Sequence, residues 1–405
     1  MAETGPRLGQ EEGKDGGGDI GYGGAGSAYY GVEDDVMNVP EYSEDRYSEM
    51  QSHIDLRLQW KDKVEYALRG LSPTSCPNDL IRHALILGRK LGEGAFGVVH
   101  EACIRNTDDR EERQRGRSTN TSNKNCYGWF IAIKVDTVRL DRLSRIRREM
   151  AIMRDANVLV QRHVCPNFTL RYGNFLCVDR DREEATVTTV MEEASDSFAT
   201  MLRVLKRSID ESVAHMLVAF SVQVFAAIAA MALNYGVIHN DLYPRNILVS
   251  VVDNMRLRYV IGDTSIIVFT NGMLLKVSDF GMGTGAKYGA PHTVRSSAKA
   301  GEVVQERAHL IVEHVTQTSL CPWARDVATW LAHLPRVMWV QLAWLHLLVS
   351  MPFESPSDLI HYMEHILSEP FLLKAGIDLA SVGGDSYVPK GTPPDETFVV
   401  RRVVD

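Results

Sequence analysis

The chain has 405 residues, of which 45% are hydrophobic and 24% are charged, and its formal net charge is −8. This composition is that of a globular protein with room for two lobes or domains, and it excludes a collagen-like fibre or wholesale disorder. The charge is uneven, because residues 1–50 hold twelve acidic and three basic side chains while the rest is nearly neutral. A near-neutral body argues against binding by bulk electrostatics, so we expect no nucleic-acid partner.

Residues 1–53 are predicted to form a disordered acidic arm, since eleven of the first fifty residues are glycine and few are apolar. The arm has neither the basic start nor the apolar centre of a secretory leader. The six cysteines are scattered and form no C-x-x-C pair, which favours reduced thiols. We therefore expect an intracellular protein, in the cytoplasm or the nucleus.

After the arm, the predicted secondary structure changes along the chain from strand-rich to mostly helical. Residues 54–79 read as a helix followed by a linker, residues 80–195 as strand-rich, residues 196–370 as mostly helical, and residues 371–405 as a C-terminal tail. In the strand-rich part, strands are expected around a glycine turn at 85–105, at 129–135 and at 185–194, with a helix at 140–156 and an exposed loop at 106–125. Strands segregated from helices predict an α+β fold of two lobes with a ligand between them.

Two segments of the helical part stand out. Residues 216–233 are apolar except for Ser221 and Gln223, which is near the lower limit for crossing a bilayer. Polar residues flank the segment closely, so we predict a buried core helix and no membrane span. Residues 250–278 contain three short strand-like runs and an Asn271–Gly272 turn.

The strongest local motif is the run GEGAFGVV at residues 92–99. Glycine lets backbone amides approach phosphate oxygens closely. A dinucleotide-binding loop would open a helix, whereas here a β-prone run follows, which favours a strand–turn–strand flap over nucleotide phosphates. An ordinary glycine-rich hairpin is the alternative.

Polar residues in apolar surroundings are further candidates for functional residues. Lys134 lies in the strand IAIKV and needs an anionic partner, which Glu149 of the next helix could supply; a surface lysine without a partner is the alternative. The run HNDLYPRNIL at residues 239–248 follows the apolar helix, and Asp279 follows an apolar strand. Asn246 and Asp279 offer the hard oxygen ligands that Mg²⁺ prefers.

In this order the glycine loop, the A-I-K strand, the H-x-D-x-x-x-x-N loop and the D-F-G triplet resemble the signature set of eukaryotic protein kinases, from about residue 87 to about residue 334. The resemblance implies a two-lobed protein kinase fold, with a small β-rich N-lobe and a larger α-helical C-lobe. It also implies ATP and Mg²⁺ as cofactors and a protein as the substrate that accepts the γ-phosphate.

The resemblance assigns roles to individual residues. The implied catalytic residues are Asp241, which would accept the proton of the substrate hydroxyl, Lys134 and Arg245, and the implied Mg²⁺ ligands are Asn246 and Asp279. The residues implied to contact ATP are Gly92, Gly94, Phe96, Gly97, Val99, Ala132, Lys134, Glu149, Met191, Glu192 and Ala194. Asp326 is similar to the buried helix aspartate that braces the catalytic loop, and His239 fits a structural role beneath that loop.

Departures from the signature bear on substrate and regulation. Asn240 replaces the arginine that pairs with an activation-loop phosphate, which suggests an enzyme that is not switched in that way. Tyr243 replaces the lysine of serine/threonine kinases. Arg245, four residues after Asp241, could supply the missing cation, and receptor-type tyrosine kinases often place arginine there. No A-P-E triplet follows Asp279.

The extra strands before Asp279 resemble an insertion in haspin and in kinases of large DNA viruses, whose setting would be the host cell. On that ground we favour a serine/threonine kinase. The alternatives are a tyrosine kinase, a small-molecule kinase of the aminoglycoside or choline type, and a pseudokinase that only scaffolds.

Overall fold

The computed structural model describes residues 52–93, 97–105, 126–205, 211–285, 287–288, 322–334, 344, 347–348, 355–368 and 396–401. All of them belong to one compact unit, Gln51–Asp405. The predictions for the arm up to residue 51, for the loop 106–125 and for most of the segment after Tyr288 lie outside the described residues. The predicted domain boundaries stay predictions.

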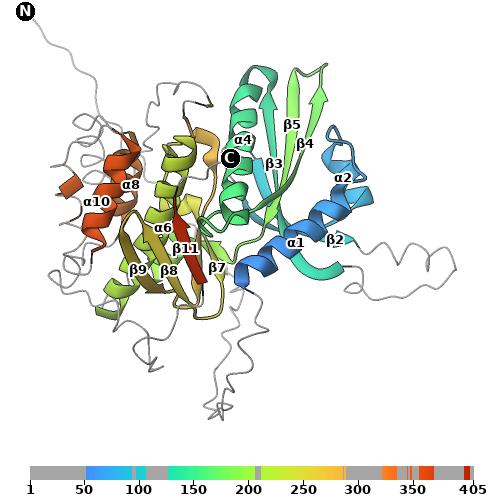
Figure 1. Ribbon diagram of the computed structural model, residues 1–405. Helices are drawn as coiled ribbons and strands as arrows, with labels where there is room; N and C mark the ends of the chain where they lie inside the picture. Colours follow the sequence, from blue (N-terminus) through green and yellow to red (C-terminus); the bar gives the residue numbers. More distant parts are fainter. Residues whose placement is uncertain are drawn as a thin grey trace, which may run out of the picture. The chain divides into compact units, whose positions relative to one another are not determined.

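A five-stranded antiparallel sheet forms the N-lobe, with the strand order β1-β2-β3-β5-β4 (Figure 1). Its strands are β1 (Leu85–Glu93), β2 (Gly97–Arg105), β3 (Cys126–Arg139), β4 (Arg171–Asp179) and β5 (Glu184–Glu192), and the helical segments beside it are α1 (His53–Leu68), α2 (Pro77–His83), η2 (Leu140–Arg142) and α4 (Leu143–Gln161). Because side chains alternate along a strand, β3 has two different faces. Lys134 faces α4, whereas Ile133 and Val135 line a cavity with residues of α2. The sheet is therefore covered by α4 on one side and α2 on the other.

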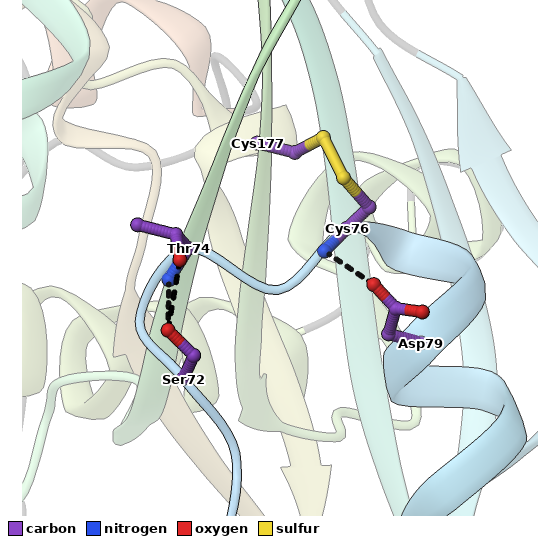
Figure 2. The surroundings of a disulfide bond; sticks show 5 residues. All are labelled: Ser72, Thr74, Cys76, Asp79 and Cys177. Carbon is purple, nitrogen blue, oxygen red and sulfur yellow. Dashed lines mark hydrogen bonds between the residues drawn. A yellow bond between two sulfur atoms is a disulfide. The ribbon is translucent and has the colours of Figure 1, made fainter.

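Helix α2 is not expected from the sequence, which predicts a linker over residues 72–79. Pro77 can begin the helix because the first helical N–H needs no partner, and the Asp79 side chain accepts a hydrogen bond from the Cys76 N–H at 3.3 Å (Figure 2). Figure 2 also shows Cys76 bridged to Cys177 of β4 by a disulfide. This disulfide ties α2 to the sheet.

The expectation of reduced thiols is therefore wrong. Cys76 and Cys177 are 101 residues apart in sequence, and closing a loop of that length stabilises a fold by about 4.7 kcal/mol in the chain-entropy account. Cys103 is disulfide-bonded as well, while Cys165 is a buried free thiol. Spacing alone could not reveal pairs that only the sheet brings together, and the intracellular location stays a prediction.

The C-lobe is built around one long apolar helix, α6 (Figure 1). Its helical segments are α5 (Phe198–Leu205), α6 (Glu211–Tyr235), η3 (Pro244–Asn246), η4 (Phe280–Met282), α8 (Pro322–His333) and α10 (Pro356–Ile366), and its strands are β6 (Asp196–Ser197), β7 (Ile247–Val251), β8 (Arg256–Ile261), β9 (Thr264–Phe269), β10 (Met273–Val277) and β11 (Glu396–Val400). Among the described helices, His215–Tyr235 is long and apolar enough to span a membrane, yet 89% of its apolar window is buried inside the protein.

The two polar residues within the apolar run 216–233 of this helix have partners within the core. Ser221 accepts a hydrogen bond from the Trp330 indole at 3.1 Å. The Gln223 side-chain oxygen accepts from the Leu275 N–H at 2.9 Å and from the Asn167 amide at 3.0 Å. Since buried polar groups are costly unless they are paired, these bonds fit a core helix rather than a lipid-facing one.

The three strands expected between residues 250 and 278 are confirmed as β8, β9 and β10, but they belong to two sheets. β10 pairs with β7, and β8 pairs with β9 and, in parallel, with β11. Asn271 and Gly272 both have positive φ, as the predicted turn requires, and the turn links the two sheets instead of closing a hairpin. The sequence gives no sign of β11, because its partner strand is more than 130 residues away.

Helix α1 is tied to the centre of the molecule by a buried ion cluster. Arg57 contacts both carboxylate oxygens of Glu192 at 2.8 Å and donates to the carbonyl of Phe168 at 2.7 Å. Lys276 of β10 contacts the same carboxylate at 2.5 Å. Burial would raise the pKa of Glu192, but the two cations lower it to about 2. Burial lowers the pKa of Lys276 to about 8, and the pKa of His53, one turn before Arg57, to about 4.

Replacing Arg57 with methionine is expected to destabilise the fold by about 3–5 kcal/mol, because removing one partner leaves buried charge without compensation. Urea unfolding monitored by circular dichroism measures this change. Lys63→Met is the matched control, since Lys63 lies exposed on the same helix, and it should change stability by less than about 0.5 kcal/mol. Equal effects of the two variants would show that the cluster does not stabilise the fold.

The cluster also predicts acid lability. His53 has a folded pKa below its unfolded value, so the unfolded state binds more protons as the pH falls from 6.5 to 4, and stability is lost over that window. The lowered pKa of Glu192 adds a second loss as the pH falls from about 4.5 through 2. Urea midpoints at a series of pH values measure both, and His53→Gln should flatten the first window alone. A midpoint independent of pH between 6.5 and 4 contradicts the role of His53.

Candidate active site

Lys134 is held at the centre of the site by carboxylates from three elements. Its Nζ lies 3.1 Å from Glu149 Oε1 of α4, 3.4 Å from Asp136 Oδ2 of β3 and 3.9 Å from Asp279 Oδ1. Burial would lower the pKa of Lys134, but the three carboxylates outweigh burial and raise it above its ordinary value. The ion pair expected between Lys134 and Glu149 is therefore present, and the lysine is fully charged.

Asp136 is the member of this group that sequence reasoning missed. It is only 2% exposed, and burial raises its pKa although Lys134 opposes the shift. A small cavity of about 20 Å³, room for a single water molecule, lies beside it and is lined by side chains of both charges, among them Arg145 and Asp279.

The loop that carries the predicted catalytic base is held in place by hydrogen bonds to Asp326. The Asp326 carboxylate accepts hydrogen bonds from the backbone N–H groups of His239 at 2.6 Å and Asn240 at 2.8 Å. This confirms the bracing contact expected of Asp326. The His239 ring contacts the Ser278 carbonyl at 2.9 Å and packs 4.9 Å from the Phe280 ring, which fits its expected structural role.

Asp241 is oriented by the two residues that end the same loop. Arg245 contacts its carboxylate oxygens at 3.0 and 3.2 Å, and the Asn246 amide donates to Asp241 Oδ2 at 2.8 Å. The Arg245 guanidinium also lies 4.5 Å over the Tyr243 ring. The side chain that is predicted to replace the missing lysine is thus held by a charge pair and a ring contact, next to the predicted base.

Asp279 and Asn240 both have positive φ, at 56° and 63°. Aspartate and asparagine tolerate this left-handed region better than most residues, so the backbone can turn sharply at both positions. The Asn240 amide then donates to the Met282 carbonyl at 3.1 Å and to Thr284 Oγ1 at 2.8 Å. The segment after Asp279 is therefore anchored to the catalytic loop by an uncharged side chain.

The same segment is anchored to the N-lobe as well. Arg145 of α4, one turn before Glu149, donates to the Gly281 carbonyl at 2.7 Å. Phe280 is buried between the lobes, with its ring 6.4 Å from that of Phe168. These contacts hold Asp279 near Lys134.

On the adenine side, the expected lining residues lie on two neighbouring strands. Ala132 and Met191 are paired across β3 and β5 and are buried. The Glu192 side chain contacts Arg57 and Lys276, so a contact with adenine at this position would come from the backbone, and the role expected of Glu192 stays a prediction. Gly94 and Phe96 lie outside the described residues.

The residues that sequence analysis missed differ in whether the sequence could have revealed them. Asp136 could have been found, because an acid two positions after Lys134 in a strand must share its face. Arg57, Lys276 and Arg145 could not, since each acts on a residue more than 80 positions away that only the fold brings near.

Comparison with known proteins agrees with this geometry. The family of protein tyrosine and serine/threonine kinases matches residues 85–303, which is more than half of the chain. No curated protein matches the sequence. The chain belongs to the protein tyrosine and serine/threonine kinase family, and it has the two-lobed α+β fold of a protein kinase.

The contacts of Asn240 lead to a prediction about the segment that follows Asp279. Asn240→Asp keeps a residue that tolerates positive φ but removes the amide donor to the Met282 carbonyl, whereas the Thr284 hydroxyl can donate to the new carboxylate. With one hydrogen bond lost, worth about 1 kcal/mol, hydrogen exchange at the Thr284 amide should become roughly fivefold faster.

Asn271→Asp is the matched control, because it removes an amide donor from the left-handed turn that links β9 and β10. It should leave exchange at Thr284 unchanged. Unaltered exchange in Asn240→Asp would mean that other contacts hold the segment.

Proposed function

We propose that this protein kinase transfers the γ-phosphate of ATP, with Mg²⁺, to a serine or threonine hydroxyl of a protein, with Asp241 as the catalytic base. The observation that supports it best is that two separate assemblies are formed at once. Lys134 is paired with Glu149, and Asp241 is held by Arg245 and Asn246. A pseudokinase has no need for both.

The residues present fit the cofactors that the family implies. The Asn246 amide nitrogen donates to the backbone carbonyl of Asp241 and to its carboxylate, which leaves the amide oxygen for a cation. Asp279 adds a half-exposed carboxylate. Oxygen ligands of this kind suit Mg²⁺, and a charged Lys134 suits phosphate oxygens.

Each of the chain's own site residues would have a separate role in phosphoryl transfer. Bound ATP supplies the phosphoryl group that is transferred. Asp241 orients the acceptor hydroxyl and takes its proton, and Asn246 and Arg245 keep the carboxylate turned toward it. Lys134 and Arg245 offset the negative charge that develops during transfer, so most of the rate acceleration comes from positioning and electrostatics.

Arg245 leaves the class of hydroxyl open between two options. An arginine four residues after the catalytic aspartate is frequent in receptor-type tyrosine kinases. The β8–β9 hairpin supports kinship with haspin and with kinases of large DNA viruses, which favours serine or threonine. We therefore keep tyrosine as the second candidate.

The test is transfer of radiolabelled γ-phosphate from Mg·ATP to the chain itself and to general protein substrates, followed by identification of the labelled amino acid. Asp241→Asn should lower the rate by about 10²–10⁴-fold, the usual contribution of a positioned base. Asp253→Asn, which changes an exposed acid away from the site, is the matched control and should keep full activity.

The other outcomes distinguish the alternatives. Label on tyrosine selects the second candidate, and label on an aminoglycoside or amino alcohol but on no protein selects a small-molecule kinase. ATP binding without transfer to any acceptor selects a scaffold. An Asp241→Asn variant as active as the parent overturns the proposed mechanism.

A further inference from the structure

The buried carboxylate of Asp136 is the part of the phosphate site that the kinase signature does not account for. Asp136 lies two residues after Lys134 on β3 and therefore on the same face of the sheet. Its Oδ2 is 3.4 Å from Lys134 Nζ, and the residue is 2% exposed. A buried carboxylate that is ion-paired with Lys134 thus lies beside the position where we propose that the phosphates bind.

Asp136 also lies directly beneath the end of the glycine loop. Gly97 is paired with Asp136 across β2 and β3, and a Cβ added to Gly97 would lie 2.5 Å from Asp136 Oδ1 and 2.1 Å from the Val135 carbonyl. Position 97 therefore has to be glycine. Within the described part of the chain, Asp136 Oδ1 has no hydrogen-bond partner.

Lys134 is therefore shared among three carboxylates, those of Glu149 and Asp279 in addition to that of Asp136. The other cations that line the cavity beside them are Arg142 of η2 and Arg145 of α4. Nucleotide phosphates that contact Lys134 would draw this cation toward themselves and would then face Asp136. Like charges repel more strongly in a water-poor site than in bulk water, and the repulsion grows with the uncompensated charge of the phosphates.

We propose that Asp136 is a specificity-determining residue that makes this site bind nucleotide as its divalent-cation complex and reject the metal-free nucleotide. A phosphate chain already neutralised by a cation is repelled little by Asp136, whereas a bare one is repelled by its full charge. This inference rests on the proposed function, because it needs nucleotide phosphates to contact Lys134.

The test measures nucleotide binding and does not depend on catalysis. Isothermal titration calorimetry gives the Kd of ADP once with Mg²⁺ and once in a chelator. Asp136→Asn keeps the shape and removes the charge, so it should lower the Kd of metal-free ADP by about tenfold or more, while the Kd of Mg·ADP changes less. The ratio of the two Kd values should shrink.

Two further variants test whether the charge of Asp136 is what changes the two Kd values. Asp141→Asn removes an exposed acid five residues on, at the start of η2, and should change neither Kd. Asp136→Ser removes the same charge with a smaller side chain, and it should shrink the ratio as Asn does if the first variant unfolds. Thermal unfolding of each variant verifies that it is folded.

Two results would overturn the proposal. Weaker binding of Mg·ADP by Asp136→Asn would show that Asp136 helps to bind the cation complex, and an unchanged ratio would show that its charge does not reach the phosphates. The proposed function is tested separately by the parent protein, since failure of the parent to bind Mg·ADP at all would refute nucleotide binding itself. A parent that binds Mg·ADP, with an unchanged ratio in the variants, refutes only the role of Asp136.

Discussion

The buried carboxylate of Glu192 is the contact on which the arrangement of the two lobes depends. It ends β5, where the chain passes from the N-lobe to the C-lobe, and it receives Arg57 from α1 and Lys276 from β10. Lys276 lies three residues before Asp279, so the same cluster that fixes the connection between the lobes also fixes the strand that delivers the predicted metal ligand. Removing any member leaves buried charge unpaired, which is why such a cluster resists deformation.

The site itself is built from charges that are shared rather than paired one to one. Lys134 meets three carboxylates, and Asp241 meets both an arginine and an asparagine amide. Shared charges can be redistributed when a highly charged ligand arrives, so they suit a site for phosphates. Such a site is also sensitive to the net charge of its ligand. In our proposal Asp136 is the residue responsible, and it lies next to the glycine loop.

The segment after Asp279 is held in place by contacts that involve no phosphate group. Asn240 holds it from the C-lobe through Met282 and Thr284, and Arg145 holds it from the N-lobe through Gly281. In the protein kinase family an arginine at the position of Asn240 would instead wait for a phosphate. The hydrogen bonds of Asn240 form without a phosphate, as the hypothesis of a kinase that is not switched in that way requires.

The sequence by itself determined the class of fold, the order of the catalytic pieces and the burial of α6, because local spacing and composition carry this information. It also placed Lys134 with Glu149 and Asp326 beneath the catalytic loop, through resemblance to a known pattern. Only the tertiary structure decided the Cys76–Cys177 bridge, the pairing of β11 with β8 and the cluster around Glu192. Each of these joins segments far apart in the chain, and no local pattern records which distant residue will be the partner.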